Sequence, residues 1–351
     1  MIALITGATG QDAAYLSKFL LEKGYKVFAT YRRLSTPNFW RLQSLGILGK
    51  VQLIPADMLD DSSLVEAVRI AKPDEIYSLA SMSYVGASFE QPLLSGQITG
   101  MGVTRLLEAI RQTYPRIRFY QASTSEMFGA NGKDGVKQSE TTPFMPSSPY
   151  ATAKLYAYWI TRNYRDSFDM FTVNGILLNH ESPLRGLEFV TRKVTNAAAR
   201  IKLGLQEYVD LGNLDAKRDW GYAPEYVECM WLMMQQHQPD DFVVATGETH
   251  SVRELCEVAF GSLELNWQDH VRVEDRLKRP ADVLCLCGDS AKAEKVLGWK
   301  ARTKFKELVE MMVAADLDRW ERQKRGESFA WDALNYPDDV NVVSTMRNRG
   351  G

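Results

Sequence analysis

A tyrosine and a lysine stand four residues apart in the segment SSPYATAKLYAYWI, as Tyr150 and Lys154. Four residues make about one turn of an α-helix, so both side chains would project from the same face. An ammonium group beside a phenol favours the phenolate and lowers its pKa. Tyr150 could then take a proton from a hydroxyl group while hydride leaves the same carbon atom.

A hydroxyl and a carboxylate precede this pair in the segment QASTSEMFG, which holds Thr124, Ser125 and Glu126. These three residues come just after a predicted strand at residues 118–122. Ligands usually bind at the carboxyl ends of the strands in a parallel sheet. We therefore expect Thr124 and Glu126 to face the phenol of Tyr150.

The segment ITGATGQDAAYL places Gly7 and Gly10 between a predicted strand and a predicted helix. Glycine lets the backbone approach a pyrophosphate, and the helix N-terminus offers unpaired N–H groups and a positive dipole. Ala13 stands where a third glycine is usual, and the dinucleotide fingerprint tolerates that added methyl group. The turn is typical of a dinucleotide site, and a glycine turn without a ligand is the alternative.

The end of the second predicted strand indicates which dinucleotide binds. An NAD site usually has an acidic residue there, which accepts hydrogen bonds from the ribose, whereas this chain has Arg32 and Arg33. Two guanidinium groups suit a 2′-phosphate, so NADP is the expected cofactor, and a solvated basic loop is the alternative. Asp57 could accept a hydrogen bond from the adenine amino group, and the turn at residues 79–83 should lie along the cofactor.

These residues need a scaffold, and the N-terminal half of the sequence alternates short apolar runs with amphipathic stretches. The predicted strands are residues 2–6, 26–30, 51–54, 75–79, 118–122 and 172–178. Strands that alternate with helices predict an α/β fold with a doubly wound parallel Rossmann sheet. Tyr150 and Lys154 fall between the fifth and sixth strands, which favours a catalytic interpretation of their spacing.

Later segments predict a smaller C-terminal α/β lobe. Helices are expected at residues 189–203 and 225–236, and strands at residues 208–211 and 242–245, the last of which could return to the main sheet. The expected division is a Rossmann domain at residues 1–180, rejoined by about residues 215–250, and a substrate-binding lobe at residues 181–214 and 251–325. Residues 326–351 lack periodicity and are expected to form a tail.

The overall charge of the chain is close to neutral, with 42 Lys and Arg against 44 Asp and Glu, which gives no reason to expect nucleic acid or a membrane surface as a partner. Without a signal-peptide pattern or an apolar run of about 18 residues, a cytoplasmic protein is expected.

The chain has four cysteines, Cys229, Cys256, Cys285 and Cys287. They include no CxxC pair, and no histidine stands at ligand spacing from them. They are expected to be reduced and mostly buried, with no bound metal.

Five segments of the chain together resemble a known family: GATGQD, STSEMFG, YATAK, LNHESPLRGLEFVTRK and GNLDAKRDW. They are similar to the extended short-chain dehydrogenase/reductase superfamily and, within it, to the GDP-mannose 4,6-dehydratase family. The resemblance runs from Ile2 to about Arg319, and NHESP, VTRK and DAKRDW are specific to that family. It implies a Rossmann fold that binds NADP, a GDP-sugar substrate, and assembly into a homodimer or homotetramer.

The resemblance implies a role for each catalytic position. Thr124, Glu126, Tyr150 and Lys154 fall on the family's catalytic positions. Tyr150 would deprotonate the C4 hydroxyl of GDP-mannose as hydride passes to NADP⁺, and Thr124 would hydrogen-bond the same oxygen. Glu126 would remove the C5 proton, water would leave from C6, and the stored hydride would return there.

The resemblance also implies two sets of binding residues. The cofactor contacts would be Gly7, Ala8, Thr9, Gly10, Gln11, Asp12, Arg32, Arg33, Ser35, Asp57, Met58, Leu79, Ala80, Ser81, Ser83, Lys154, His180 and Arg185. The nucleotide-sugar contacts would be Ser83, Ser125, Asn179, Val190, Lys193, Arg218 and Arg279. Basic residues gathered on one lobe suit a diphosphate, and a surface salt bridge is the alternative for each of them.

The sequence leaves several alternatives open. A 4-epimerase or 4-reductase of the superfamily would use the same tyrosine and lysine but would need no carboxylate such as Glu126. A protein that binds NADP without turnover would be expected to lose the tyrosine or the lysine, and this chain keeps both. Met82, Tyr84 and Leu34 depart from the family pattern near the sugar pocket and the 2′-phosphate loop. A GDP-heptose or another GDP-sugar is therefore an alternative substrate.

Overall fold

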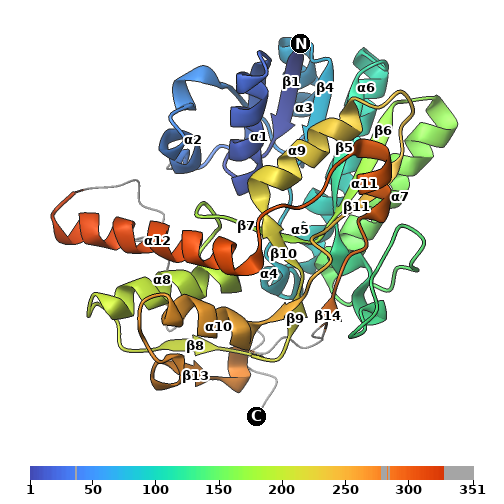
Figure 1. Cartoon of the computed structure of the whole chain (residues 1–351). Helices are drawn as coiled ribbons and strands as arrows, with labels where there is room; N and C mark the ends of the chain where they lie inside the picture. Colours follow the sequence, from blue (N-terminus) through green and yellow to red (C-terminus); the bar gives the residue numbers. More distant parts are fainter. Residues whose placement is uncertain (36–37, 278–282, 284, 328–351) are drawn as a thin grey trace.

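The computed structural model describes residues 1–35, 38–277, 283 and 285–327. Arg279, one of the expected nucleotide-sugar contacts, and nearly all of the expected tail at residues 326–351 lie outside the described residues. Figure 1 shows a parallel sheet flanked by helices and, below it in this view, a smaller group of helices and short strands from later parts of the chain.

Seven parallel strands form the central sheet, in the order β3-β2-β1-β4-β5-β6-β11. Their bounds are β1 (Ile2–Thr6), β2 (Lys26–Tyr31), β3 (Gln52–Pro55), β4 (Glu75–Ser78), β5 (Arg118–Thr124), β6 (Thr172–Leu177) and β11 (Asp241–Val244). The chain starts at β1, moves outward to β3, and then crosses to β4 and the opposite edge. The doubly wound α/β arrangement that the sequence predicts is confirmed, and the strand order reverses between β1 and β4.

Neighbouring residues of the central strands enter two different cores. Ile5 of β1 and Tyr77 of β4 belong to one hydrophobic cluster, whereas Leu4 and Ile76 belong to another. Successive side chains of a strand point to opposite faces, so a strand that is covered on both faces needs apolar residues at nearly every position. This requirement explains the unbroken apolar run IALI in β1.

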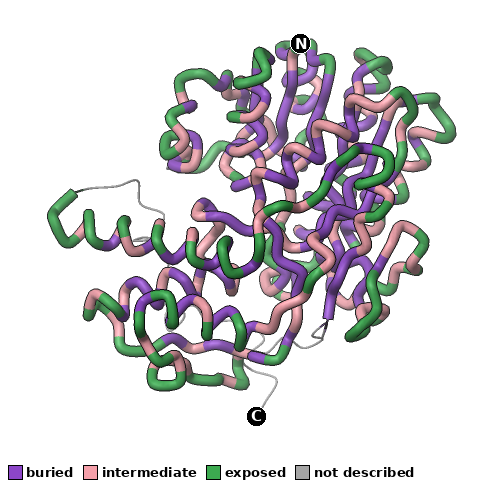
Figure 2. The backbone as a smooth tube through the Cα atoms, viewed as in Figure 1, coloured by how far each residue is buried: buried purple, intermediate pink, exposed green. Residues whose placement is uncertain are grey.

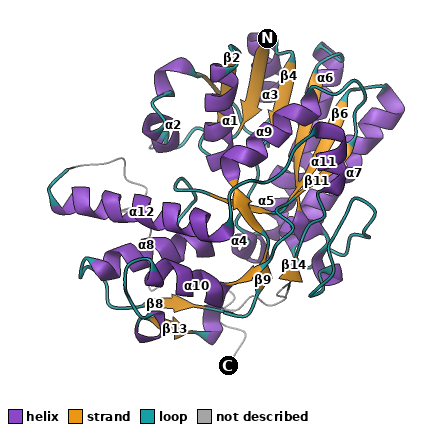
Figure 3. Cartoon of the chain, in the orientation of Figure 1, coloured by secondary structure: helices purple, strands orange, loops and turns teal. Residues whose placement is uncertain are grey.

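Helices cover both faces of the sheet (Figure 3). The helices that share the cluster of Ile5 are α1 (Gln11–Glu22), α2 (Trp40–Ser44), α9 (Ala223–Met234) and α11 (Ala291–Leu297). Those that share the cluster of Leu4 are α3 (Asp61–Ala71), α6 (Gly102–Thr113) and α7 (Pro149–Phe168). Between β4 and α6 the chain forms α4 (Val85–Glu90), α5 (Pro92–Ser95) and a π-helical turn (Gly96–Met101). Figure 2 shows that the strands are buried while the outer turns of the helices are exposed.

The later part of the chain builds a third core. It joins Val194, Leu255 and Met312, which lie on α8 (Val190–Lys202), α10 (Val252–Gly261) and α12 (Phe305–Lys324). The small sheets of this region pair β8 (Val209–Leu211) with β13 (Val271–Val273), β7 (Asn179–Glu181) with β10 (Trp220–Tyr222), and β9 (Lys217–Arg218) with both β12 (His250–Ser251) and β14 (Cys285–Leu286). The helices predicted at residues 189–203 and 225–236 are confirmed as α8 and α9, with small shifts of their ends.

The four cysteines are buried and free, as the sequence predicts. Over the described ranges, no helix combines the length and the apolar character that crossing a membrane requires. That part of the chain also contains no group of three or more His, Cys, Asp or Glu side chains placed to hold a metal ion.

Candidate active site

The glycine turn between β1 and α1 has the backbone shape that a pyrophosphate site needs. Gly7 has a φ of +85°, in the left-handed region that favours glycine, and a Cβ atom there would lie 3.1 Å from Ala80 Cα. The N–H groups of Gly7 and Ala8 donate to the Thr30 carbonyl at 3.1 and 2.7 Å, which fixes the turn against β2. Gly10 has no side chain that could cap α1, so the first N–H groups of the helix can bind an anion. The turn therefore fits a dinucleotide.

The other predicted cofactor residues lie in the loops after the next three strands. Arg32, Arg33 and Ser35 follow β2 and are exposed, Asp57 and Met58 follow β3, and Leu79, Ala80, Ser81 and Ser83 follow β4. The Thr6 hydroxyl accepts hydrogen bonds from the N–H groups of Leu79 and Ala80, both at 3.0 Å, and ties the loop after β4 to the end of β1. Because parallel strands end together, these loops lie at one edge of the sheet.

Thr124, Ser125 and Glu126 lie at the same edge, at the end of β5. Thr124 is the last residue of β5, and a single 3₁₀ turn (Ser125–Met127) follows it. The Glu126 N–H donates to Thr124 Oγ1 at 3.3 Å, which caps that turn. Glu126 is only 8 % exposed, so its carboxylate is held among protein groups instead of in bulk water.

The start of α7 sets the direction of Tyr150 and Lys154. Ser148 Oγ accepts a hydrogen bond from the Ala151 N–H at 3.1 Å, and Pro149 occupies the first turn, where its missing N–H is not needed. The helix therefore begins immediately before Tyr150. Tyr150 and Lys154 are both buried, and α7 packs against β5, which carries Thr124.

Burial dominates the protonation of Tyr150 and Lys154. Burial raises the pKa of Tyr150 above its ordinary value, and the charge of Glu126 raises this pKa further. A hydrogen bond from Thr124 acts in the opposite direction and lowers it. Burial also lowers the pKa of Lys154 to about 8. The Lys154 Nζ donates to the Ala122 carbonyl at 2.7 Å and lies 5.9 Å from the centre of the Tyr150 ring. In this arrangement the Lys154 ammonium faces a carbonyl, and the expectation that it lowers the Tyr150 pKa stays a prediction.

His180 and Asp12 form an ion pair beside the glycine turn. His180 Nε2 lies 2.8 Å from Asp12 Oδ2, and its Nδ1 lies 2.8 Å from the Leu178 carbonyl oxygen. Burial alone would lower the His180 pKa, but the Asp12 charge and the hydrogen bonds outweigh burial and raise it. Burial alone would raise the Asp12 pKa, but His180 and Arg185 lower it. A carboxylate and a carbonyl only accept hydrogen bonds, so this pair of partners favours a ring that donates from both nitrogens, in agreement with the raised His180 pKa.

The described nucleotide-sugar positions come from several elements. Ser83 follows β4, Ser125 follows β5, Asn179 begins β7, Val190 and Lys193 lie on α8, and Arg218 lies on β9. Asn179 Oδ1 is buried and has no hydrogen-bond partner among the described residues, so it fits a donor group of a ligand. The Arg185 Nε lies 3.0 Å from Glu181 Oε2, and the guanidinium lies 3.5 Å from the centre of the Phe189 ring.

Two residues at this site carry no signal in the sequence pattern. Tyr226 of α9 stacks on the His180 ring, with 4.7 Å between the ring centres. Arg41 of α2 donates to the carbonyls of Thr9 and Leu184 at 2.8 and 2.7 Å. Tyr226 contacts a ring face and Arg41 contacts backbone carbonyls, and these partners are distant in sequence. The spacing of neighbouring residues cannot reveal such contacts.

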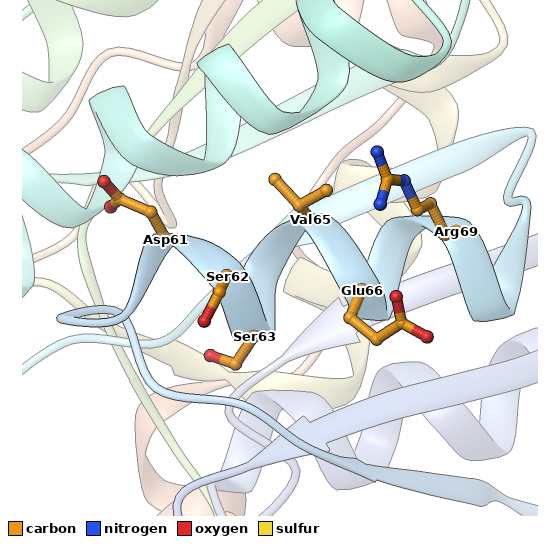
Figure 4. Close-up of a pocket in the computed structure, with 6 residues that line it drawn as sticks. All are labelled: Asp61, Ser62, Ser63, Val65, Glu66 and Arg69. Atoms are coloured by element: carbon orange, nitrogen blue, oxygen red, sulfur yellow. The ribbon is translucent and has the colours of Figure 1, made fainter.

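An open depression on the outer side of α3 is separate from this site (Figure 4). It is lined by Asp61, Ser62, Ser63, Val65, Glu66 and Arg69. None of these residues belongs to the predicted catalytic or binding sets, so the depression is not part of the candidate active site.

Known proteins with a similar sequence identify the family. The family model described as GDP-mannose 4,6 dehydratase matches residues 4–312. GDP-mannose 4,6 dehydratase 2 of Arabidopsis thaliana is 50 % identical over 333 residues, which cover 92 % of this chain and 88 % of that protein. The GDP-mannose 4,6 dehydratase of Homo sapiens is 46 % identical over 342 residues, which cover 90 % and 91 %. This chain belongs to the GDP-mannose 4,6-dehydratase family.

The fold of this family member also matches solved structures. The crystal structure of DesIV, a dTDP-glucose 4,6-dehydratase from Streptomyces venezuelae with NAD bound, superposes with a TM-score of 0.81 at 21 % identity and covers 93 % of this chain and 98 % of that one. At this identity the likeness shows the fold. The predicted Rossmann fold and the predicted membership of the GDP-mannose 4,6-dehydratase family are both confirmed.

Proposed function

We propose that this member of the GDP-mannose 4,6-dehydratase family converts GDP-mannose into GDP-4-dehydro-6-deoxy-mannose and water. The observation that carries the proposal is the buried Glu126 carboxylate, whose charge acts on the Tyr150 phenol that Thr124 also hydrogen-bonds. Oxidation of one alcohol carbon needs the phenol and the lysine. Elimination of water also needs a base that reaches the neighbouring carbon, and Glu126 supplies it.

Tyr150 and Glu126 each transfer one proton in the proposed reaction. Tyr150 takes the proton of the C4 hydroxyl, and Thr124 donates a hydrogen bond to the same oxygen. Glu126 takes the C5 proton, which the C4 ketone makes acidic, and gives it to the C6 hydroxyl as that group leaves as water. Tyr150 then returns its proton to C5. The bound cofactor would supply a reversible hydride store for the oxidation at C4 and the reduction at C6.

Burial raises the Tyr150 pKa while the Lys154 ammonium faces the Ala122 carbonyl, so this arrangement of the lysine does not favour the phenolate. We propose that Lys154 turns towards the phenol when ligands bind and lowers its pKa. The kcat of the wild type should then rise with pH through a pKa below about 10, the ordinary value of tyrosine. Lys154→Met should shift that rise to higher pH, and an unchanged profile would contradict this role.

We propose NADP as the cofactor. The glycine turn, the loop after β4 and the His180–Asp12 pair would hold the dinucleotide, and the exposed Arg32 and Arg33 would hold its 2′-phosphate. Calorimetric titration should show much tighter binding of NADP(H) than of NAD(H). Replacing both arginines by alanine should weaken NADP(H) binding far more than NAD(H) binding. Equal affinities in the wild type would remove the argument from the arginine pair.

We propose that residues 181–214 and 251–325 bind the nucleotide sugar against the Rossmann domain. Lys193, Arg218 and Arg279 would meet the diphosphate, and Asn179 Oδ1 would accept a hydrogen bond from a hydroxyl group of the ligand. We also propose a homodimer or homotetramer, since closed symmetry is the usual arrangement of such enzymes. Light scattering that gives a monomer at micromolar concentration with cofactor bound would contradict this. A cytoplasmic location stays a prediction from the sequence.

An isotope experiment tests the reaction itself. With GDP-mannose deuterated at C4, the label should appear at C6 of the product, and a solvent deuteron should enter at C5 when the reaction runs in heavy water. A panel of nucleotide sugars, followed by mass spectrometry for loss of water, would show whether another GDP-sugar reacts faster. If the C4 label accumulated in free NADPH with stoichiometric use of the cofactor, the protein would be an ordinary dehydrogenase. Inversion at C4 without loss of water would indicate an epimerase.

A further inference from the structure

Residues 182–185 form a turn between β7 and α8, in which the Arg185 N–H donates to the Ser182 carbonyl at 3.0 Å. The carbonyls of Pro183, Leu184 and Arg185 each accept a hydrogen bond from at least one arginine. These arginines come from three helices, α2, α8 and α12. The turn that carries Arg185 is therefore held from both lobes.

The smaller lobe holds this turn through a buried ion pair. Arg192 of α8 and Asp316 of α12 are both fully buried, with Nε 2.7 Å from Oδ1. Arg192 Nη1 donates to the Pro183 and Arg185 carbonyls at 2.9 and 2.8 Å. Arg319 donates to Asp316 Oδ1 at 2.7 Å and to the Pro183 carbonyl at 2.5 Å. Figure 1 shows α8 and α12 side by side. Separating these buried charges would leave one of them unpaired, so this side of the turn is rigid.

Arg41 holds the same turn from the Rossmann side. Its Nε donates to the Leu184 carbonyl at 2.7 Å, and its Nη1 donates to the Thr9 carbonyl at 2.8 Å. Thr9 lies in the glycine turn, so one guanidinium spans the two turns. A second link joins them where the Ser182 hydroxyl donates to Gln11 Oε1 at 2.6 Å. A planar fork of five N–H groups can donate to two carbonyls in different directions, whereas an ammonium is a compact point charge.

We propose that Arg41 is a positioning residue that couples the cofactor site to the nucleotide-sugar site. The proposal rests on the proposed function, which places a pyrophosphate on the glycine turn and the diphosphate of the nucleotide sugar near Lys193 of α8, the helix that follows residues 182–185. A ligand that fixes the glycine turn also fixes the Thr9 carbonyl, and through Arg41 it fixes the Leu184 carbonyl in the turn that leads into α8. Each ligand therefore strengthens the binding of the other by the same factor, because such coupling is reciprocal.

The coupling can be measured without turnover. NADPH is titrated by tryptophan fluorescence, first without GDP and then with saturating GDP. In the wild type, GDP should lower the Kd of NADPH within the range usual for coupled sites, roughly 5- to 150-fold. Arg41→Lys keeps the positive charge but loses the fork, so the ratio of the two Kd values should fall towards one.

Two further variants separate this effect from misfolding. Arg69→Lys, on the outer side of α3, is the matched control and should keep the wild-type ratio. Arg41→Gln retains an N–H donor on a shorter side chain and should lose the coupling as well, and thermal unfolding checks that each variant folds. A wild-type ratio in Arg41→Lys, or no effect of GDP on NADPH binding in the wild type, would overturn the proposal. If the proposed function were wrong, the wild type would release no water from GDP-mannose. That result is separate from the ratio of the two Kd values.

Discussion

At the residue scale, Glu126 is the side chain on which the proposed reaction most depends. Its carboxylate is almost fully buried beside Tyr150. We expect Glu126→Gln to bind NADPH and GDP like the wild type and to lose about 10²- to 10⁴-fold in turnover, as the loss of a general base commonly does. Mass spectrometry of the product measures the rate. Glu66→Gln, on the exposed outer side of α3, is the matched control and should keep the wild-type kcat. Normal turnover in Glu126→Gln would remove this residue from the mechanism.

The His180–Asp12 pair should make the free energy of unfolding depend on pH. His180 sets the alkaline limit of the range in which the pair stabilises the fold, and Asp12 sets the acidic limit. The His180 pKa is raised in the folded protein, so its contribution is complete below the unfolded pKa of about 6.5 and is lost as the pH rises through the folded value. The Asp12 pKa is lowered, so its contribution is lost as the pH falls through its folded value. Urea unfolding of the wild type and His180→Gln should show a difference in free energy that shrinks at alkaline pH. A difference that is constant from pH 6 to pH 10 would mean that the ring is neutral.

At this scale, side-chain types and spacing predicted part of the site. The helical spacing of Tyr150 and Lys154 placed both on the buried face of α7, and Thr124 and Glu126 lie at the end of β5 as expected. The direction of the Lys154 ammonium did not follow from the sequence, because its partner is the Ala122 carbonyl. Every residue has a carbonyl group, so a contact to one leaves no compositional signal.

At the scale of the elements, substitutions at two glycines distinguish the penalty for a side chain in left-handed backbone from the penalty for crowding a neighbouring residue. Gly7 and Gly24 have φ angles of +85° and +80°, but a Cβ atom at Gly24 would have open space while one at Gly7 would crowd Ala80. Gly24→Ala should lose about 1–2 kcal/mol of unfolding free energy, the usual penalty for a side chain in left-handed backbone. Gly7→Ala should lose more, because the Ala80 backbone would have to shift to make room for the Cβ atom, and should also weaken NADPH binding. Urea unfolding measures both variants, and equal losses would mean that the contact with Ala80 carries no penalty.

Element positions followed closely from apolar periodicity, since strands covered on both faces and helices with one buried face leave clear patterns. Strands β1 to β6 and the return of β11 to the sheet agree with the predicted segments. The π-helical turn (Gly96–Met101) and the very short strands β9, β12 and β14 were not predicted. Strands of two residues contain too few positions for any alternation to show.

At the scale of the whole molecule, burial should protect all four thiols. Burial raises the pKa of Cys256 to about 12 and that of Cys287 to about 11, and it raises the pKa of Cys229 and Cys285 as well. The thiolate is the reactive form, so the native protein should react very slowly with a disulfide reagent at pH 8. All four thiols should react at once after unfolding in guanidinium chloride. Rapid stoichiometric labelling of the native protein would show that a cysteine becomes accessible through local opening.

Strand β11 follows β6 in the sheet but comes much later in the sequence, which has a consequence for the nascent chain. On the ribosome, β6 can be completed long before β11, because α8 and β8 to β10 must be translated between them. Until residues 241–244 emerge, β6 is the edge of an unfinished sheet, and its free N–H and C=O groups can pair with another chain. The nascent polypeptide is thus exposed to such pairing in the interval between the emergence of β6 and that of β11. The yield of folded protein in a cell should depend on how quickly the ribosome crosses residues 178–240 and on the chaperones that shield that edge.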